Sequence, residues 1–115
     1  MSPRHMSLLQ GTLDVLVMKA VADEARHGYG VAEWIRRTTD GTLEIEDGAL
    51  YTSLHRMHKR GWLEAEWGVS ENNRRAKYYR LTADGRAELA RASGDWERYA
   101  DAVFKVLGTA GGTKS

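Results

Sequence analysis

The chain has 115 residues, a formal net charge of +1 and no cysteine. This length allows one domain with a modest core but no second substrate domain, and the lack of cysteine excludes disulfides and thiolate metal sites, which is compatible with a cytoplasmic protein. No apolar run approaches the ~20 residues that span a bilayer and the N-terminus lacks the apolar core of a signal peptide, so we expect a soluble protein without membrane contact.

Two helices are predicted in the first third of the chain. Thr12 is a suitable N-cap, and apolar side chains recur at helical spacing after it until the pattern ends near Ala25. A second helix is predicted over residues 31–39, opened by the segment His27–Gly28–Tyr29–Gly30 and ended by Asp40–Gly41. Because His27 precedes this helix, we expect it to order the helix start rather than to act in catalysis.

Residues 42–60 are predicted to contain a short strand and a third helix. Residues 42–45 favour extended backbone and fit as a third strand beside a hairpin further along the chain. In the helix that follows, Leu50, Leu54 and Met57 recur at i, i+4 and i+7 and predict one buried face. The acidic residues at its start suit the positive end of a helix dipole better than acid–base catalysis.

The other faces of this third helix carry polar side chains that can bind phosphates and base edges. The candidates for DNA binding are Tyr51, Thr52, Ser53, His55, Arg56 and Lys59. His55 and His58 lie three positions apart and could share a metal ion, but no cysteine and no acid at a matching helical spacing completes a ligand set. We therefore expect neither a metal site nor a cofactor.

A β-hairpin with a basic tip is predicted over residues 62–82, because alternating patterns flank the segment GVSENNRRAK. Asn72–Asn73 accept positive φ angles and mark the turn. The tip adds Asn73, Arg74, Arg75 and Lys77 to the DNA-binding candidates. Seven basic and three acidic side chains lie between residues 55 and 80, a net charge of +4 in a chain that totals +1. Such a hairpin beside a polar helix face predicts DNA binding. The alternative is that the charged side chains are those of a solvated surface loop without a binding role.

A long helix is predicted from Thr82–Ala83–Asp84 onward. Its apolar side chains recur at alternating spacings of three and four, in a heptad-like stripe longer than a three-helix core can cover. This stripe predicts a homodimer, and the alternative is that the helix folds back on its own domain. The candidate interface residues are Leu89, Trp96, Tyr99, Val103, Phe104 and Leu107. Its aromatic members could line a pocket for a small apolar or aromatic effector, although ordinary dimer packing accounts for them more simply.

The predicted order of elements is helix, helix, short strand, helix, strand, strand. This is the order of a winged helix-turn-helix domain, in which the third helix enters the major groove. The predicted fold class is mainly α with a small antiparallel β wing (α+β) and a C-terminal dimerisation helix. The chain is accordingly divided into a DNA-binding domain (1–82), a dimerisation helix (83–108) and a flexible Gly-rich tail (109–115).

Four separated stretches resemble the PadR family of transcriptional repressors. They are LLQGTLDVLVMKAV, HGYGVAEWI, LEIEDGALYTSLHRMHKRGWLEAEWG and NNRRAKYYRLTADGRAEL, and the resemblance covers nearly the whole chain up to Leu107. It implies a winged helix-turn-helix dimer of the small subclass, with a single C-terminal dimerising helix. The family's Gly-X-Leu-Tyr motif is here Gly48–Ala49–Leu50–Tyr51, and its wing motif is the segment 73–79. Where the family commonly has proline after the tyrosine, this chain has Thr52, so its base preference can differ.

We therefore expect a sequence-specific regulator of transcription. The resemblance implies a dimeric repressor that binds double-stranded DNA at a palindromic operator and is released by a small-molecule or stress signal. The alternative is a winged-helix module that binds a protein partner, which a weak dependence of affinity on salt would indicate. No Gly-rich phosphate loop or nucleophile–base pair is present in the sequence, so an enzyme is not expected.

Overall fold

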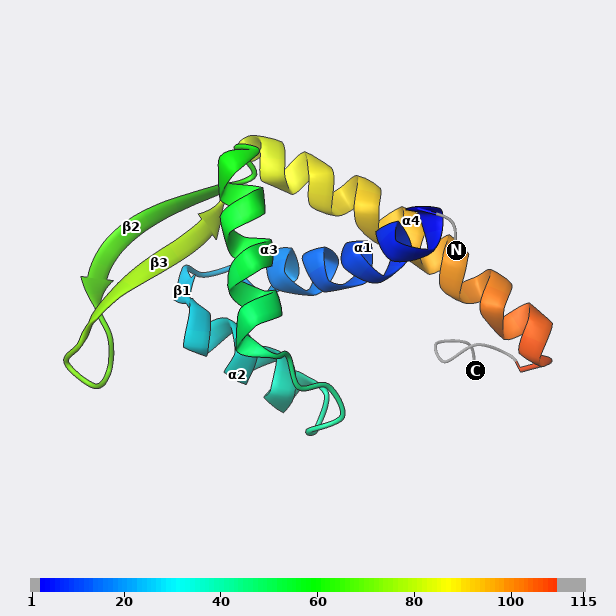
Figure 1. The fold of residues 1–115 in the computed structure, drawn as a ribbon, viewed down its shortest axis with the longest axis horizontal. Helices are drawn as coiled ribbons and strands as arrows, with labels where there is room; N and C mark the ends of the chain where they lie inside the picture. The colour runs from blue at the N-terminus through cyan, green and yellow to red at the C-terminus, as the bar shows by residue number, and fades with distance from the viewer. Residues whose placement is uncertain (1–2, 110–115) are drawn as a thin grey trace.

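The computed structural model describes residues 3–109, with side chains from residue 11 onward. The elements of this part, in chain order, are α1 (Pro3–Ala20), β1 (Arg26–His27), α2 (Gly28–Thr38), α3 (Asp47–Lys59), β2 (Leu63–Val69), β3 (Arg75–Leu81) and α4 (Ala83–Leu107). Figure 1 shows the β2–β3 hairpin projecting to one side of α3 and α4 running away on the other side. The predicted α+β winged helix-turn-helix fold is confirmed. Of the predicted flexible tail, residues 110–115 lie outside the described residues.

The core lies between helices α1, α2 and α3 and the base of the hairpin. Leu50, Leu54 and Met57, the predicted buried face of α3, are at most 1% exposed, so this prediction is confirmed. They belong to one cluster with apolar side chains of the other elements, which include Val17, Met18, Val21, Val31, Ile35, Leu63, Tyr79 and Leu81. Burial of this stripe fixes the orientation of α3 and leaves its polar side in the solvent.

Helix α1 differs from its prediction at both ends. It begins well before Thr12 and ends at Ala20 rather than near Ala25. Gly11 lies within the helix without breaking it, because a helical glycine costs only about 1 kcal/mol, which packing can offset. At the other end, a backbone hydrogen bond from Val21 to the carbonyl three residues earlier tightens the last turn, and the chain then turns toward the sheet.

The prediction of the third strand was wrong. The sheet is antiparallel with the order β1-β3-β2, and its third strand is the pair Arg26–His27, which faces Tyr79 and Tyr78 of β3. Residues 42–45, predicted to be this strand, lie in the loop between α2 and α3 (Figure 1). The residue types at positions 42–45 favour extended backbone, but they do not determine whether this segment pairs with another strand. The pairing depends on which segment α1 and α2 bring beside β3.

Helix α2 begins and ends close to its predicted limits. His27 is its N-cap, and Nδ1 of its ring accepts the backbone N–H of Gly30 over 3.0 Å. The expectation that His27 orders the helix start is therefore confirmed. At the other end, Asp40 and Gly41 take φ angles of +52° and +82°, which turn the chain out of the helix.

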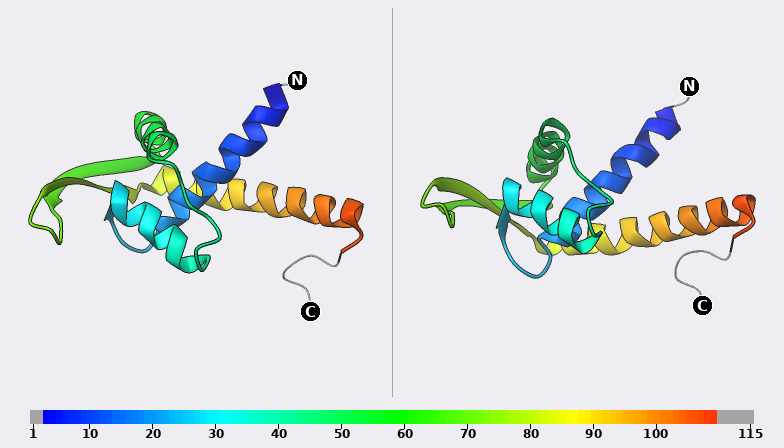
Figure 2. Two further views of the ribbon diagram at one scale, coloured as in Figure 1. Left: turned by 60° about the horizontal axis from the view of Figure 1, so that its bottom comes forward. Right: turned by 90° about the horizontal axis from the view of Figure 1, so that it is seen from below.

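Helix α4 begins at the predicted N-cap, where the Thr82 hydroxyl accepts the backbone N–H of Gly85 over 2.9 Å. Gly85 is buried so closely against the hairpin that an added Cβ would lie 2.1 Å from the carbonyl oxygen of Trp62. Leu89 was assigned to a dimer interface, but it packs against the core of its own domain. The beginning of α4 is covered within the monomer, whereas its later turns run beyond the core (Figure 2).

Candidate nucleic-acid interface

Helix α3 presents a polar face to the solvent. Tyr51, Thr52, His55 and Lys59 are exposed, and with Arg56 and Arg60 they line a shallow groove of about 690 Å³. The prediction that Tyr51, His55 and Lys59 project away from the core is confirmed, and Thr52 is exposed beside them. Hydroxyl, imidazole and ammonium groups on one helix face are suited to phosphate oxygens and base edges.

The two histidines of α3 have different surroundings. His55 is exposed on the polar face, whereas the ring of His58 lies edge-on to Tyr79 with 6.4 Å between the ring centroids. Among the residues that the structure describes, no group of three or more histidine and acidic side chains is placed to hold a metal ion. His55 therefore belongs, with its polar neighbours, to the exposed face of α3 that can bind phosphates and base edges.

Two further candidates on α3 are held by the acidic side chain of Asp14 in α1. Ser53 is 1% exposed and its hydroxyl donates to Asp14 over 2.7 Å, so the prediction that it faces outward is wrong. The guanidinium of Arg56 donates to both carboxylate oxygens of Asp14, over 2.7 and 2.9 Å. These hydrogen bonds raise the pKa of Arg56 above its ordinary value. Ser53 and Arg56 therefore tie α3 to α1, at the side of the polar face.

The tip of the hairpin is a tight turn. The backbone N–H of Ser70 donates to Arg74, and the N–H of Asn73 donates back to Ser70, both over 2.8 Å. Of the two asparagines expected to take positive φ, Asn73 does so with a φ of +61°. Arg74 and Arg75 are exposed beside this turn. The predicted cationic tip is thus present as a hydrogen-bonded turn on a two-stranded arm.

Trp67 on β2 organises the cations of the hairpin. Its ring is half exposed, with the guanidinium carbon of Arg75 4.2 Å and the ammonium of Lys77 5.7 Å from the ring centroid. Both cations come from β3, where Lys77 is the cross-strand partner of Trp67. A cation over an indole face is held by the ring's negative charge density, so Trp67 keeps both positive groups on one side of the sheet.

A groove of about 810 Å³ separates the hairpin from the helices. From the helical side it is lined by His27, Gly28, Tyr29 and Tyr51, and from the hairpin by Trp67, Ser70, Glu71, Asn72, Arg74, Arg75, Ala76, Lys77 and Tyr79. The structure thus brings Tyr51 into one groove with three predicted hairpin cations. Burial raises the pKa of the Tyr79 phenol and the nearby Tyr51 raises it further, so the Tyr79 phenol stays uncharged at neutral pH.

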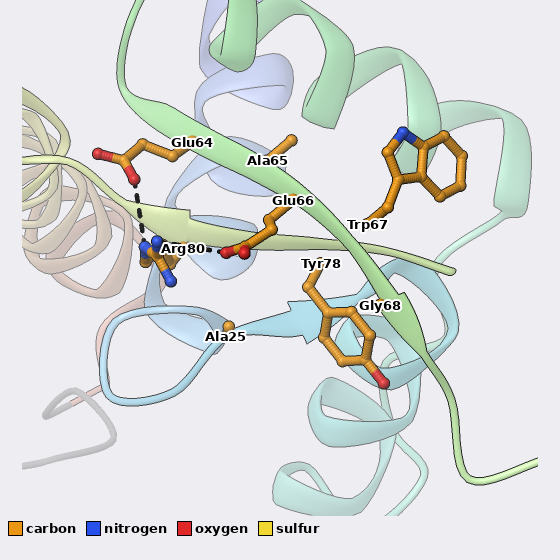
Figure 3. Close-up of a pocket in the computed structure, with 8 residues that line it drawn as sticks. All are labelled: Ala25, Glu64, Ala65, Glu66, Trp67, Gly68, Tyr78 and Arg80. Carbon is orange, nitrogen blue, oxygen red and sulfur yellow. Dashed lines mark hydrogen bonds and ion pairs between the residues drawn. The ribbon is translucent and has the colours of Figure 1, made fainter. Parts of the chain in front are cut away.

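The opposite side of the hairpin has a different charge. Figure 3 shows Trp67 on one side of the sheet and Tyr78, Glu66 and Arg80 on the other. There Arg80 forms ion pairs with Glu64 over 3.2 Å and with Glu66 over 3.5 Å, at a hollow of about 250 Å³. These pairs neutralise Arg80, although the sequence counts it among the local basic residues. The positive charge is therefore confined to the side of Trp67.

Tyr51 is placed by a glycine. A Cβ added to Gly28 would lie 2.4 Å from the hydroxyl oxygen of Tyr51 and 2.6 Å from the ring carbon that carries it. The phenol therefore rests on the bare backbone at the start of α2, and Tyr51 is still 50% exposed. This contact holds the Tyr51 ring at the edge of the groove that it lines together with the hairpin.

We expect Gly28→Ala to displace Tyr51 and weaken DNA binding roughly tenfold, the value of about one charge-assisted hydrogen bond. The thermal midpoint should change little, because the half-exposed ring can swing into the solvent. Fluorescence anisotropy with a labelled duplex measures the loss. If the substitution acts through Tyr51, adding it to Tyr51→Ala costs nothing more, and an additional loss would assign Gly28 a role of its own.

Sequence patterns did not identify Asp14, Trp67 and Glu71 as functional residues. Asp14 could have been found, because it is the single acid within the largely apolar run LLQGTLDVLVMKAV. Trp67 could have been found as well, because a tryptophan facing a lysine across a predicted hairpin is a possible cation–π pair. Glu71 lies in the turn itself. The alternation of side chains along a strand does not extend into a turn, so the sequence does not show which way the Glu71 side chain points.

An exposed polar helix beside a cationic β-hairpin defines a winged-helix protein that binds DNA. Residues 17–91 match the family described as "Transcriptional regulator PadR-like family", and the chain belongs to this family. It is a DNA-binding transcriptional regulator and not an enzyme. Within residues 3–109, none of the helices is long and apolar enough to cross a membrane.

The chain is also similar to one curated protein and to solved structures of transcriptional regulators. Uncharacterized protein X from Lysinibacillus sphaericus is 28% identical over 89 residues, which cover 77% of this chain and 82% of that protein. A transcriptional regulator from Clostridium thermocellum is similar with a TM-score of 0.76 and 25% identity, over 86% of this chain and 96% of the other. A PadR family transcriptional regulator from Eggerthella lenta has a TM-score of 0.70 and 29% identity, over 90% and 88% of the two chains.

Proposed function

We propose that the protein is a dimeric, sequence-specific repressor that binds a palindromic operator in the cytoplasm and leaves it on a small-molecule or stress signal. The observation that carries this proposal is the polar face of α3 beside the positively charged side of the hairpin. A helix of this kind fits the major groove, and a cationic hairpin next to it reaches the adjacent phosphates or minor groove.

We assign different contacts to the two parts of the interface. Thr52, His55 and Lys59 lie on the exposed face of α3 and would read bases, while Tyr51 would bind a phosphate at the edge of the groove. The tip would contribute phosphate contacts from Asn73, Arg74, Arg75 and Lys77. Ser53 is not included, because it is buried, and Arg56 would act by holding α3 on Asp14.

The later turns of α4 are the proposed dimer interface. Trp96, Tyr99, Val103 and Leu107 are all more than one third exposed in the monomer, and Leu107 reaches 66%. A two-fold pair of such stripes would bury them and set the separation of the two α3 helices, which must be about 34 Å for half-sites one helical turn apart. An aromatic effector inserted beside Trp96 or Tyr99 would change this separation and release DNA.

The decisive experiment measures binding at several salt concentrations to a duplex selected from a random pool and to a scrambled duplex. We expect a steep loss of affinity with salt on both and tighter binding to the selected duplex, because phosphate contacts release counterions and base contacts do not. Equal affinity for the two duplexes would contradict sequence-specific binding. Affinity that is insensitive to salt would favour the alternative of a protein-binding module.

The Arg75→Ala variant should weaken binding to both duplexes alike and flatten the salt slope by about one unit, since one phosphate contact is lost. Arg80→Ala is the matched control, because Arg80 lies on the other side of the same strand and is paired with Glu64 and Glu66. It should leave the slope unchanged. Equal slopes for Arg75→Ala and the wild type would contradict the assignment of Arg75 to DNA.

A further inference from the structure

A hydrogen bond joins the tip of the hairpin to the start of α2. Nε2 of His27 lies 3.1 Å from a carboxylate oxygen of Glu71, 44 positions further along the chain. The other ring nitrogen, Nδ1, accepts the N–H of Gly30 and so carries no proton. In the neutral ring the proton is therefore on Nε2, which donates to Glu71. We call this hydrogen bond the clasp.

The two partners of the clasp differ in how firmly they are held. His27 is 8% exposed, caps α2 and packs edge-on against Tyr78, with 5.2 Å between the ring centroids. The Glu71 side chain is 81% exposed and lies in the turn. His27 is thus a fixed anchor on the helical body, and the clasp attaches the turn to it.

Fixing Glu71 fixes the whole turn, because Ser70, Asn73 and Arg74 are joined to one another by backbone hydrogen bonds. Within the part of the chain whose side chains are described, Glu71 is the one residue of the turn that is hydrogen bonded to the helical body. The base of the hairpin is held by its pairing with β1, but the tip lies beyond that pairing. The clasp is therefore the contact that sets the direction of the tip.

The charge of Glu71 also indicates that its role is to hold the turn and not to bind DNA. A carboxylate beside Arg74, Arg75 and Lys77 repels phosphate and by itself weakens DNA binding. The hydrogen bond from His27 lowers the pKa of Glu71, so the carboxylate is ionised at neutral pH. A full negative charge in this cationic groove opposes DNA binding. The presence of Glu71 there is therefore better explained by a structural role than by contact with DNA.

We propose that Glu71 and His27 are positioning residues for DNA binding. The clasp holds the hairpin tip in the direction that presents Arg74 and Arg75 to the same DNA that α3 reads, and neither clasp residue contacts the DNA. This inference rests on the proposed role of the hairpin in DNA binding. Its physical basis is preorganisation, since a tip that is already oriented loses less conformational freedom on binding.

Two substitutions of Glu71 separate the clasp from the charge. Glu71→Gln and Glu71→Ala both remove the negative charge, but only the glutamine keeps an oxygen that accepts the His27 N–H. The probes are a duplex selected from a random pool by the wild-type protein and a scrambled duplex. Because the tip contacts phosphates on either duplex, the alanine variant should bind both duplexes roughly three- to tenfold more weakly than the glutamine variant, the range of one net hydrogen bond. Equal affinities of the two variants would overturn the proposal.

A second measurement tests the clasp without DNA. Backbone order parameters from ¹⁵N relaxation should fall at Asn72 and Asn73 in the alanine variant and stay at the wild-type value in the glutamine variant, with equal thermal midpoints. Unchanged order in the alanine variant would overturn the clasp. If the wild-type protein binds no duplex at all, the proposed function fails, whereas the order parameters still decide whether the clasp holds the tip.

A third variant approaches the clasp from its other side. His27→Asn keeps an acceptor for the Gly30 N–H at the N-cap and is too short to reach Glu71. We expect it to bind DNA more weakly than the wild type, because the clasp is lost and the carboxylate remains. The double variant should bind no more weakly than Glu71→Ala, because His27 has no clasp to lose once Glu71 is gone. Additive losses would show that the two residues act separately, which contradicts the clasp.

Discussion

Val103→Glu is expected to turn the protein into a monomer and to lower its affinity for a palindromic operator by roughly 100-fold or more, because the link between two half-site contacts is lost. Val103 is already 37% exposed in the monomer, so the charge should be tolerated before assembly. In the proposed interface the same charge would be buried without a partner. Sedimentation equilibrium measures the assembly, and titration of a palindrome and a half-site measures the affinity.

Lys105→Glu is the control for this substitution. It places the same side chain two residues further along α4, on the opposite face and exposed to the solvent. It should leave the dimer intact, although it changes the net charge by more. Trp96→Ala is less informative, because the indole N–H of Trp96 also donates to Thr12 within the monomer over 2.7 Å. A Val103→Glu protein that remains dimeric would show that the exposed stripe of α4 is not the interface.

Asp14→Ala should lower the free energy of unfolding by roughly 2–4 kcal/mol, as expected when a largely buried ion pair loses one member. Asp14 accepts from Ser53 and Arg56, so its removal leaves a buried hydroxyl and a largely buried guanidinium without their partner. Urea unfolding followed by circular dichroism measures the loss. DNA affinity should fall in folded protein as well, because α3 loses its polar tie to α1.

Asp95→Ala is the comparison for the Asp14 variant. Asp95 also accepts from two arginines, Arg91 over 2.7 Å and Arg98, but it is half exposed on the surface of α4. Exposed pairs of this kind contribute about 0–1 kcal/mol, so its loss should be small. Similar losses for the two variants would show that the Asp14 network is no stronger than a surface pair. Ser53→Ala should leave base preference unchanged, because the hydroxyl is buried.

Features that depend on near neighbours in the chain were predictable from the sequence. The buried face of α3 follows from Leu50, Leu54 and Met57, which one turn of helix brings together. The start of α4 follows from Thr82, whose hydroxyl needs only the N–H three residues later. The turn of the hairpin follows from Asn73, a residue type that accepts positive φ. In each case the energy that decides the structure comes from atoms close together in the chain.

Features that depend on partners far apart in the chain became visible only in the folded protein. Ser53 and Arg56 have the pattern of an exposed face, and only the approach of α1 gives them Asp14, 39 and 42 positions away. The third strand is Arg26–His27 rather than 42–45 because α1 and α2 bring that segment beside β3. The clasp between His27 and Glu71 spans 44 positions. Periodicity shows which side of an element is apolar, but which polar group meets which is settled only when the elements pack.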